Sequence, residues 1–319
     1  MGSSDEHAPG RPKRANPLGG RARSALGADM SLFLEYSLVG LASGGMYALI
    51  ALGFVLVFKG TGVFNFAQGE LMMVGAYVYL AVTQLMGAHW ALGLLAAVVV
   101  GFALGALIER AVLRPLAGQP TLAIVMATVG IGLVFKGAIG LVFGPDQRQL
   151  PELLPRKPIF LGDILIPGGV FWTFVVSLAI VLACLAWFRF TRSGVAMRAA
   201  ASSQANAFAV GINVPAISAA TWGLAASTGA LAGVLLSALN SLTPHLGDLA
   251  LAVLAVLIVG GLDSLGGVIV GGLVIGWLQA MTGAYLGGSW REVMPYLVVL
   301  VVLLVRPHGL FGRKEIERI

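Results

Sequence analysis

Charged side chains are scarce in this chain, since Asp, Glu, Lys and Arg make up only 11% of its 319 residues. A typical soluble domain carries about 25%. Hydrophobic residues make up 58%, and they form long runs, such as 91–108, instead of a strand-like alternation. A bilayer core requires roughly 20 apolar residues per helix, and a backbone in lipid must satisfy its own hydrogen bonds. The composition therefore excludes a water-soluble fold and predicts membrane-spanning helices.

The chain also lacks the residue patterns of common catalytic and metal sites. Its single cysteine, Cys184, lies in an apolar run, where a small hydrophobic filler is the expected role. The four histidines lie far apart, and neither HExxH nor GxSxG occurs. GxxxxGK[ST] is absent too, which excludes ATP hydrolysis by this chain through a P-loop. We therefore expect no enzyme activity, no metal and no cofactor bound by this chain itself.

The net charge of +6 would suggest a nucleic-acid partner in a soluble protein, but the basic residues lie in the tails and between the apolar runs. This is the positive-inside distribution of a membrane protein, so no nucleic-acid partner is expected. The segments predicted to be cytoplasmic, because they carry Arg or Lys, are 109–120, 189–215 and the C-terminal tail. The segments predicted to face outside are 83–90, 144–169, 240–249 and 283–290.

The apolar runs predict an all-α, polytopic transmembrane bundle of about eight or nine segments, some of them broken or re-entrant. The predicted crossings are 32–58, 61–82, 91–110, 121–143, 170–188, 216–239, 250–262 with 268–282, and 291–305. The join at 260–267 either turns the chain back or breaks one helix. Lipid is thus the first expected partner of this chain.

Three segments make up the predicted domain organisation. Residues 1–29 are polar, basic and rich in Pro and Gly, which predicts a disordered tail, although Met30 is an alternative native start. Residues 30–312 form the transmembrane domain, and 313–319 form a cytoplasmic C-terminal tail. Counting crossings back from the loops places the N-terminus outside, whereas the basic residues of the tail favour the opposite side.

The densest polar stretch within the apolar sequence is 60–70, where Asn65, Gln68 and Glu70 stand among glycines. Polar groups inside a membrane are costly and therefore mark functional candidates. One interpretation is a broken helix at a translocation path, which makes these three residues candidate path residues. The other is a cytoplasmic turn in which Asn65 caps the next helix.

Three further charged residues have simpler expected roles. Lys136 lies late in its apolar segment, so its side chain is expected to snorkel to the outer surface. Asp263 is expected in a turn, and Asp248 is expected to be an exposed end or a helix cap.

Glycines at four-residue spacing predict helix faces that allow close backbone approach. The candidate packing residues are Gly40, Gly44, Gly267, Gly271, Gly272 and Gly276.

The predicted cytoplasmic loop 189–215 contains an alanine-rich helix over 194–211, closed by Gly211 and followed by Pro215. A short helix on the cytoplasmic face is a surface to which an energy-supplying partner protein can bind. An interfacial helix resting on lipid is the alternative.

Several strings in this order resemble the permease subunits of branched-chain amino acid ABC importers. They are GMYALIALG at 45–53, NFAQGE at 65–70, GAY at 75–77, ERAVLRPL at 109–116, ATVG at 127–130, GGLDSLGG at 260–267 and RPHGLFG at 306–312. The resemblance covers nearly all of 31–313. It implies a transmembrane permease domain in a bacterial inner membrane, which translocates branched-chain or related small amino acids.

The resemblance also implies partners. These are a second homologous permease or a second copy of this chain, cytoplasmic subunits that use ATP, and a periplasmic substrate-binding protein. The segment that contacts the ATPases corresponds to 189–215, with Arg198, Ala199, Ser203, Gly211 and Ile212 as candidate coupling residues. Residues 202–205 lack the charges that relatives usually carry there, and Gln68 stands where a His is common.

Two other functions fit the same residues. A permease for urea or short amides can use this framework. An autonomous channel or ion-coupled transporter would need several carboxylates within the membrane, which are scarce beyond Glu70.

Overall fold

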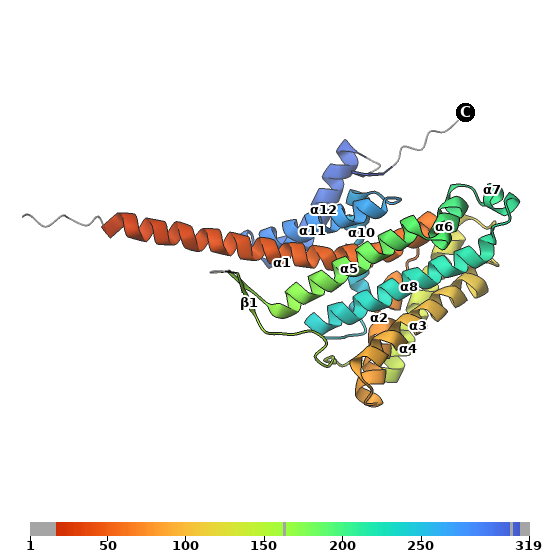
Figure 1. The fold of residues 1–319 in the computed structure, drawn as a ribbon, viewed down its shortest axis with the longest axis horizontal. Helices are drawn as coiled ribbons and strands as arrows, with labels where there is room; N and C mark the ends of the chain where they lie inside the picture. The colour runs from red at the N-terminus through yellow and green to blue at the C-terminus, as the bar shows by residue number, and fades with distance from the viewer. Residues whose placement is uncertain (1–16, 162–163, 307–308, 313–319) are drawn as a thin grey trace, which may run out of the picture.

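A computed structural model of the chain describes residues 17–161, 164–306 and 309–312. Its long helices are α1 (Pro17–Thr61), α3 (Trp90–Ile108), α4 (Thr121–Phe143), α5 (Gly168–Phe190), α8 (Val214–Leu239), α11 (Leu265–Tyr285) and α12 (Gly288–Val305) (Figure 1). The short helices are α2 (Gln68–Leu80), α6 (Arg192–Ser202), α7 (Gln204–Ala209), α9 (Leu249–Ala252) and α10 (Leu254–Gly260).

The remaining regular elements are small. The π-helical turns η1 (Ala81–Leu85) and η2 (Glu109–Leu113) extend α2 and α3, and η3 (Leu246–Asp248) is a single 3-10 turn. The strands β1 (Ile159–Leu161) and β2 (Ile164–Ile166) pair antiparallel, with Ile159 opposite Ile166. This hairpin lies within the long loop between α4 and α5, outside the helical bundle.

Within the described residues, seven helices are long and apolar enough to cross a membrane. They are Met30–Thr61, Trp90–Leu113, Thr121–Phe143, Gly168–Phe190, Val214–Leu239, Leu265–Tyr285 and Gly288–Val305. The all-α polytopic bundle is confirmed in this form, but the count of eight or nine segments is not. The predicted crossing 61–82 contains only the 13 helical residues of α2 before η1, and 250–262 contains two helices of four and seven residues.

The N-terminal end of α1 differs from the sequence-based expectation. Residues 17–29, which fall in the predicted disordered tail, continue α1 as helix in the structure. The predictions for 1–16 and 313–319 concern residues outside the described ranges.

Burial separates the central helices from the peripheral ones. In the 18-residue apolar stretch of each spanning helix, 78% of the residues of α8 and 72% of those of α1 are buried. The corresponding shares are 11% for α4 and 6% for α12. The short helix α2 packs against α8, α3 and α4, and Met72, Tyr77 and Tyr79 are among its fully buried side chains. The short helix α2 therefore lies at the centre of the bundle.

The predicted packing glycines lie at two helix contacts. A Cβ on Gly44 of α1 would lie 2.6 Å from the Gly272 carbonyl oxygen, and one on Gly40 would lie 2.7 Å from the Ala280 Cβ on α11. Gly276 faces the same stretch of α1. Gly267 and Gly271 face α10, and a Cβ on Gly271 would lie 2.6 Å from the Val256 carbonyl oxygen. Two backbones thus approach α11 on different sides, as small residues allow.

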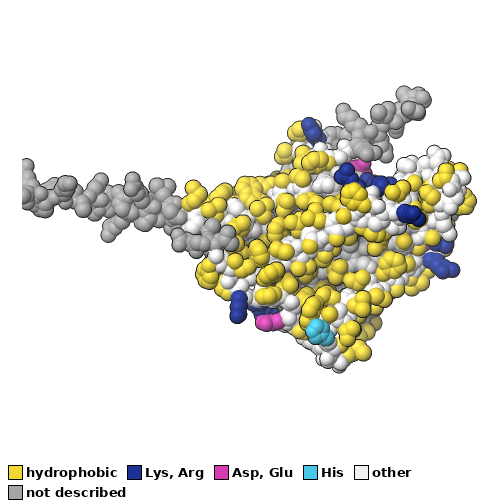
Figure 2. All heavy atoms as spheres, viewed as in Figure 1, with side chains coloured by type: hydrophobic (Ala, Val, Ile, Leu, Met, Phe, Trp, Pro, Cys, Tyr) yellow, Lys and Arg dark blue, Asp and Glu magenta, His cyan; other side chains and the backbone are white. Residues whose placement is uncertain are grey.

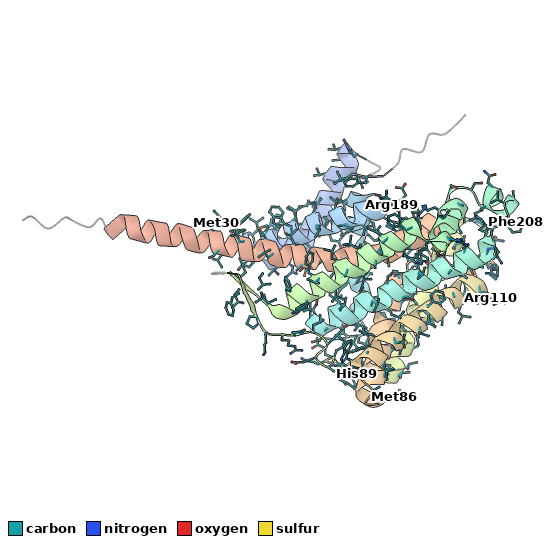
Figure 3. All side chains as sticks on the ribbon, viewed as in Figure 1. Met30, Met86, His89, Arg110, Arg189 and Phe208 are labelled. Carbon is teal, nitrogen blue, oxygen red and sulfur yellow. The ribbon has the colours of Figure 1, made fainter. Side chains whose placement is uncertain are left out.

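The loops gather at two ends of the bundle, in the grouping expected from their charges. Figure 3 places Phe208, Arg110 and Arg189 toward one end, and Met86 and His89 toward the other. At the first end, Lys59 Nζ donates to the Asp263 carbonyl oxygen at 3.0 Å. At the second, Gln84 Nε2 donates to the Gln149 carbonyl oxygen at 2.7 Å. Figure 2 shows a broad hydrophobic band between these two ends, as expected for a lipid-facing surface.

The close α1–α11 contact yields a test by matched glycine substitutions. Gly44→Ala places a Cβ within 2.6 Å of the Gly272 oxygen, whereas a Cβ on Gly137 of α4 meets no atom within 4 Å. We expect Gly44→Ala to lower the free energy of unfolding by about 1–3 kcal/mol, the usual effect of overpacking. Gly137→Ala should leave it unchanged or raise it by up to about 1 kcal/mol, because alanine favours the helix more than glycine does. Thermal unfolding in detergent measures both variants, and equal melting temperatures would contradict the packing described.

Candidate functional site

The centre of the candidate site is the point where α2 begins. The chain between Thr61 and Gln68 is not α-helical, and α2 starts at Gln68 with Ala67 as its N-cap residue. Asn65 is therefore not the N-cap of α2. Its Oδ1 instead accepts a hydrogen bond from the Ala67 N–H at 3.0 Å, and its carbonyl oxygen accepts one from the Gln68 N–H at 3.2 Å. Asn65 thereby closes a tight turn that satisfies the backbone ahead of the helix.

Gln68 connects this turn to the rest of the bundle. It is fully buried, and its Nε2 donates to the Ala225 carbonyl oxygen of α8 at 2.8 Å. Its Oε1 accepts from Asn65 Nδ2 at 3.3 Å. A Cβ on Gly229 of α8 would lie 2.7 Å from Gln68 Nε2, so the side chain occupies space that this glycine leaves free. Both amide side chains are satisfied within the protein.

Glu70 lies one helical position beyond Gly69 and faces a different neighbour. A Cβ on Gly132 of α4 would lie 3.1 Å from the Glu70 Oε2 atom, so the carboxylate lies against a helix face without a side chain. Glu70 is only partly buried, in contrast to Asn65 and Gln68. The structure therefore separates the three candidate path residues into two buried amides and one accessible carboxylate.

A second chain break meets α2 at the same place. The turn η3 packs on α2, and a Cβ on Gly247 would lie 3.0 Å from the Gly69 carbonyl carbon and 3.1 Å from the Glu70 nitrogen. After η3 the chain continues as α9 and α10 to Gly260. The segment 240–260 thus begins without helix and becomes helical from Leu246, and this break lies beside that of α2.

The break at η3 carries an ion pair between two residues for which the sequence predicted separate roles. Lys136 Nζ of α4 donates to both carboxylate oxygens of Asp248, at 2.8 and 3.0 Å. His245 Nδ1 lies 3.1 Å from Asp248 Oδ2. Lys136 was expected to snorkel to the outer surface and Asp248 to be an exposed end or a helix cap, whereas in the structure the two bind each other. The sequence shows that each is a charged residue within or next to an apolar run, but it does not show that the two form a pair.

A third polar contact joins α3 to α8 at the end expected to be cytoplasmic. Glu109, 4% exposed, accepts a hydrogen bond from Arg114 at 2.9 Å. Arg114 also donates to the Pro215 carbonyl oxygen at 3.2 Å, at the start of α8. This ion pair ties the ERAVLRPL stretch to the end of the loop 189–215.

The loop 189–215 folds as two helices, so the predicted single helix over 194–211 is wrong. Ser203 is extended, with φ −163° and ψ 110°, and its side chain accepts from the Asn206 N–H at 3.2 Å to cap α7. Serine competes with helix continuation because its hydroxyl bonds nearby backbone groups. Gly211, with φ +83°, then ends this segment, and Asn213 caps α8.

The candidate coupling residues make different kinds of contact within the loop 189–215. Arg198 donates to the Phe188 carbonyl oxygen and stacks over the Phe188 ring, which fixes α6 against α5. Ala199 and Ile212 are half-buried, and Ser203 marks the break between the two helices. Sequence reasoning missed Phe208 and Val210, which are 67% and 75% exposed at this end. The signal that could have found them is a large apolar residue in a short polar helix outside the membrane.

The buried amide cluster yields a stability test. Gln68→Met keeps the side-chain volume similar but removes the hydrogen bonds that Gln68 makes with the Asn65 side-chain nitrogen and the Ala225 carbonyl oxygen. We expect a loss of about 1–3 kcal/mol in unfolding free energy, typical of buried polar groups that lose their partners. Gln84→Met removes an exposed bond and is the matched control, with a much smaller loss. Equal melting temperatures for the two variants would show that Gln68 does not fix α2.

The fold and the polar breaks define a class: a multi-pass helical membrane protein with discontinuous helices meeting inside the bundle. The profile of one protein family, described as the branched-chain amino acid transport system permease component, matches residues 36–303. The chain therefore belongs to the family of permease components of branched-chain amino acid transport systems.

Individual relatives align over nearly the whole chain. The high-affinity branched-chain amino acid transport system permease protein LivH of Salmonella typhimurium is 32% identical over 303 residues, covering 90% of this chain and 98% of its own. The corresponding protein BraD of Pseudomonas aeruginosa is 32% identical over 301 residues, with the same coverage. The structure of PsaBC from Streptococcus pneumoniae in complex with Fab aligns at 18% identity with a TM-score of 0.49, covering 88% of this chain and 94% of that chain.

Proposed function

We propose that this chain is the permease subunit of an ATP-driven importer that moves branched-chain or related small amino acids across a bacterial inner membrane. The family match over 36–303 is the observation that carries this proposal. The seven long apolar helices and the two interior chain breaks support it, because unwound backbone within a membrane is tolerated where it is enclosed by protein or lines a cavity.

ATPase subunits dock, in this proposal, on α6 and α7. Phe208 and Val210 offer exposed apolar side chains outside the hydrophobic band, where a protein partner can cover them. Arg198 and Gly194 hold α6 against the Phe188 backbone at the end of α5, so a push on α6 is transmitted to a membrane helix. ATP is bound and hydrolysed by those partners, and this chain supplies the path.

The outer end receives the substrate-binding protein. A cavity of about 650 Å³ opens there between the loop after α4, the start of α5 and the end of α8, lined in part by Glu152, Arg156 and Asn240. A second permease, either a homologue or another copy of this chain, completes the path. ATP drives import only if it stabilises one of the inward- and outward-open states more than the other.

Reconstitution tests the function as a whole. Proteoliposomes that contain this chain, its permease partner and the ATPases should take up leucine only with internal ATP and external binding protein. Uptake by this chain without any ATPase would contradict the importer and favour the autonomous channel or ion-coupled transporter. ATP-driven uptake of urea or short amides, without branched-chain amino acids, would favour the alternative substrate class.

A matched pair of phenylalanines tests the ATPase contact. Phe208 and Phe160 are both 67% exposed but belong to opposite ends, Phe208 to α7 and Phe160 to the β1–β2 hairpin. We expect Phe208→Asp to reduce co-purification of the ATPase subunits by about tenfold or more, since an interface core excludes charge. Phe160→Asp should retain them. The docking surface lies elsewhere if both variants retain the ATPases equally.

A further inference from the structure

The ion cluster around η3 lies at the depth of the bilayer centre. Gly132, against which Glu70 lies, is eleven residues from each end of α4, from Thr121 and from Phe143. At 1.5 Å per residue this is about 16 Å from either end of a helix that spans the membrane. Lys136 lies one turn further along, about 10 Å from the helix end. Asp248 follows Gly247, which contacts Gly69 and Glu70.

These charges are not enclosed by the chain itself. The side chains of Lys136 and Asp248 are 28% and 51% exposed on the surface of the bundle, and Glu70 is partly exposed. Ionised groups at this depth are too costly to face lipid, and in membrane proteins they line the bundle interior or a water-filled cavity. The α2–α4–η3 face, defined by Glu70, Gly132, Lys136 and Asp248, therefore does not contact acyl chains.

The opposite face of α4 has the character expected for lipid contact. Successive residues of a helix are about 100° apart, so Val129 lies about 20° from Lys136 and Val134 about 160° from it. The exposed residues on the far side, including Val134, Leu141 and Val142, are all apolar. Two sides of one helix thus face two different environments.

Within the cluster, the Glu70 carboxyl group has no ion-pair partner among the described residues. Lys136 is bonded to Asp248. The site therefore offers a carboxylate and, next to it, a lysine, which are complementary to the ammonium and carboxylate groups of a zwitterion. The ammonium of an amino acid complements Glu70, and its carboxylate complements Lys136 in competition with Asp248.

We propose that the α2–α4–η3 face is a wall of the solute path, where Glu70 receives the ammonium group and Lys136 the carboxylate of a passing zwitterionic amino acid. This inference rests on the proposed transport function and names the residues that bind the two charged groups of the substrate. The Lys136–Asp248 pair holds the lysine charge in place between passages, so that it is not left alone in a medium of low polarity.

Thiol labelling tests the path wall independently of any substrate. Cys184→Ala removes the single cysteine, and Val129→Cys or Val134→Cys then places one thiol on either side of α4. In the assembled transporter in membranes, Val129→Cys should react with a water-borne thiosulfonate about tenfold or more faster than Val134→Cys, because thiosulfonates react in water and not in lipid. Exposure in the isolated chain, 37% for Val129 and 68% for Val134, would favour the reverse order. Equal or reversed rates overturn the proposal.

Reagent charge tests the role of Glu70 on the same variant. A cationic thiosulfonate should modify Val129→Cys faster than an anionic one, because the carboxylate attracts cations in a site of low dielectric. Adding Glu70→Gln should lower this cation-to-anion rate ratio several-fold. An unchanged ratio would show that Glu70 does not act on solutes in the path.

Transport then separates a substrate role from a structural one. The double variant Lys136→Met with Asp248→Asn removes both charges together, so a purely structural pair would be replaced without loss of uptake. We expect leucine uptake to fall about tenfold or more, as for loss of a charged hydrogen-bond partner of the substrate, while the melting temperature stays near that of the wild type. Wild-type uptake by the double variant would overturn the role of Lys136.

The two proposals fail in different ways. If the wild-type complex takes up no branched-chain amino acid with ATP and binding protein, the proposed function fails, and with it the zwitterion assignment. The labelling contrast between Val129→Cys and Val134→Cys still decides whether the face lines a path. If wild-type uptake is normal but the two labelling rates are equal, the proposal that the α2–α4–η3 face lines the solute path is refuted, and the proposed transport function stands.

Discussion

The hydrogen bond from Gln68 to the Ala225 carbonyl oxygen determines where α2 begins, and the centre of the bundle depends on that position. Without it, the amide of Gln68 would be a buried polar group with no partner on α8. With it, the non-helical residues before α2 are held inside the protein, and Asn65 completes their hydrogen bonding. Asn65 and Gln68 are therefore buried beside α8 and do not form a surface turn.

The start of α2 in turn positions the second break. Gly69 offers backbone without a side chain, so η3 can pack directly on it through Gly247. The start of α2 and the turn η3 then meet near the middle of α4, where Glu70 faces Gly132 and Asp248 binds Lys136. Discontinuous helices at the bilayer midplane are a recurrent way for transporters to present polar groups to a solute.

The long spans could be predicted from the sequence because hydrophobic runs of bilayer length have few alternative structures. The run 121–143 was predicted with both ends where the structure has them, and the other spans were placed within a few residues. The crossing 61–82 was not recovered, because composition does not show where helical hydrogen bonding starts within a polar, glycine-rich stretch. The break at Ser203 was missed for a similar reason, since the alanine-rich sequence on both sides favours helix.

The candidate site was only partly predictable. Asn65, Gln68 and Glu70 stand out in sequence as polar residues in an apolar run, but their roles depend on α8 and α4, which are far away along the chain. The Lys136–Asp248 pair joins residues 112 positions apart, so no local pattern reveals it. Phe208 and Val210 carry a signal only once they are known to lie outside the hydrophobic band.

The central claim is that the two chain breaks meet at the bilayer centre. A cryo-EM map of the assembled transporter in a lipid nanodisc measures this directly, because the lipid density gives the depth of each residue. The account predicts Gly69 in contact with Gly247 at the level of Gly132, midway between the two headgroup layers. A map in which α2 begins at the cytoplasmic headgroup layer, with Gly247 apart from it, would contradict the account.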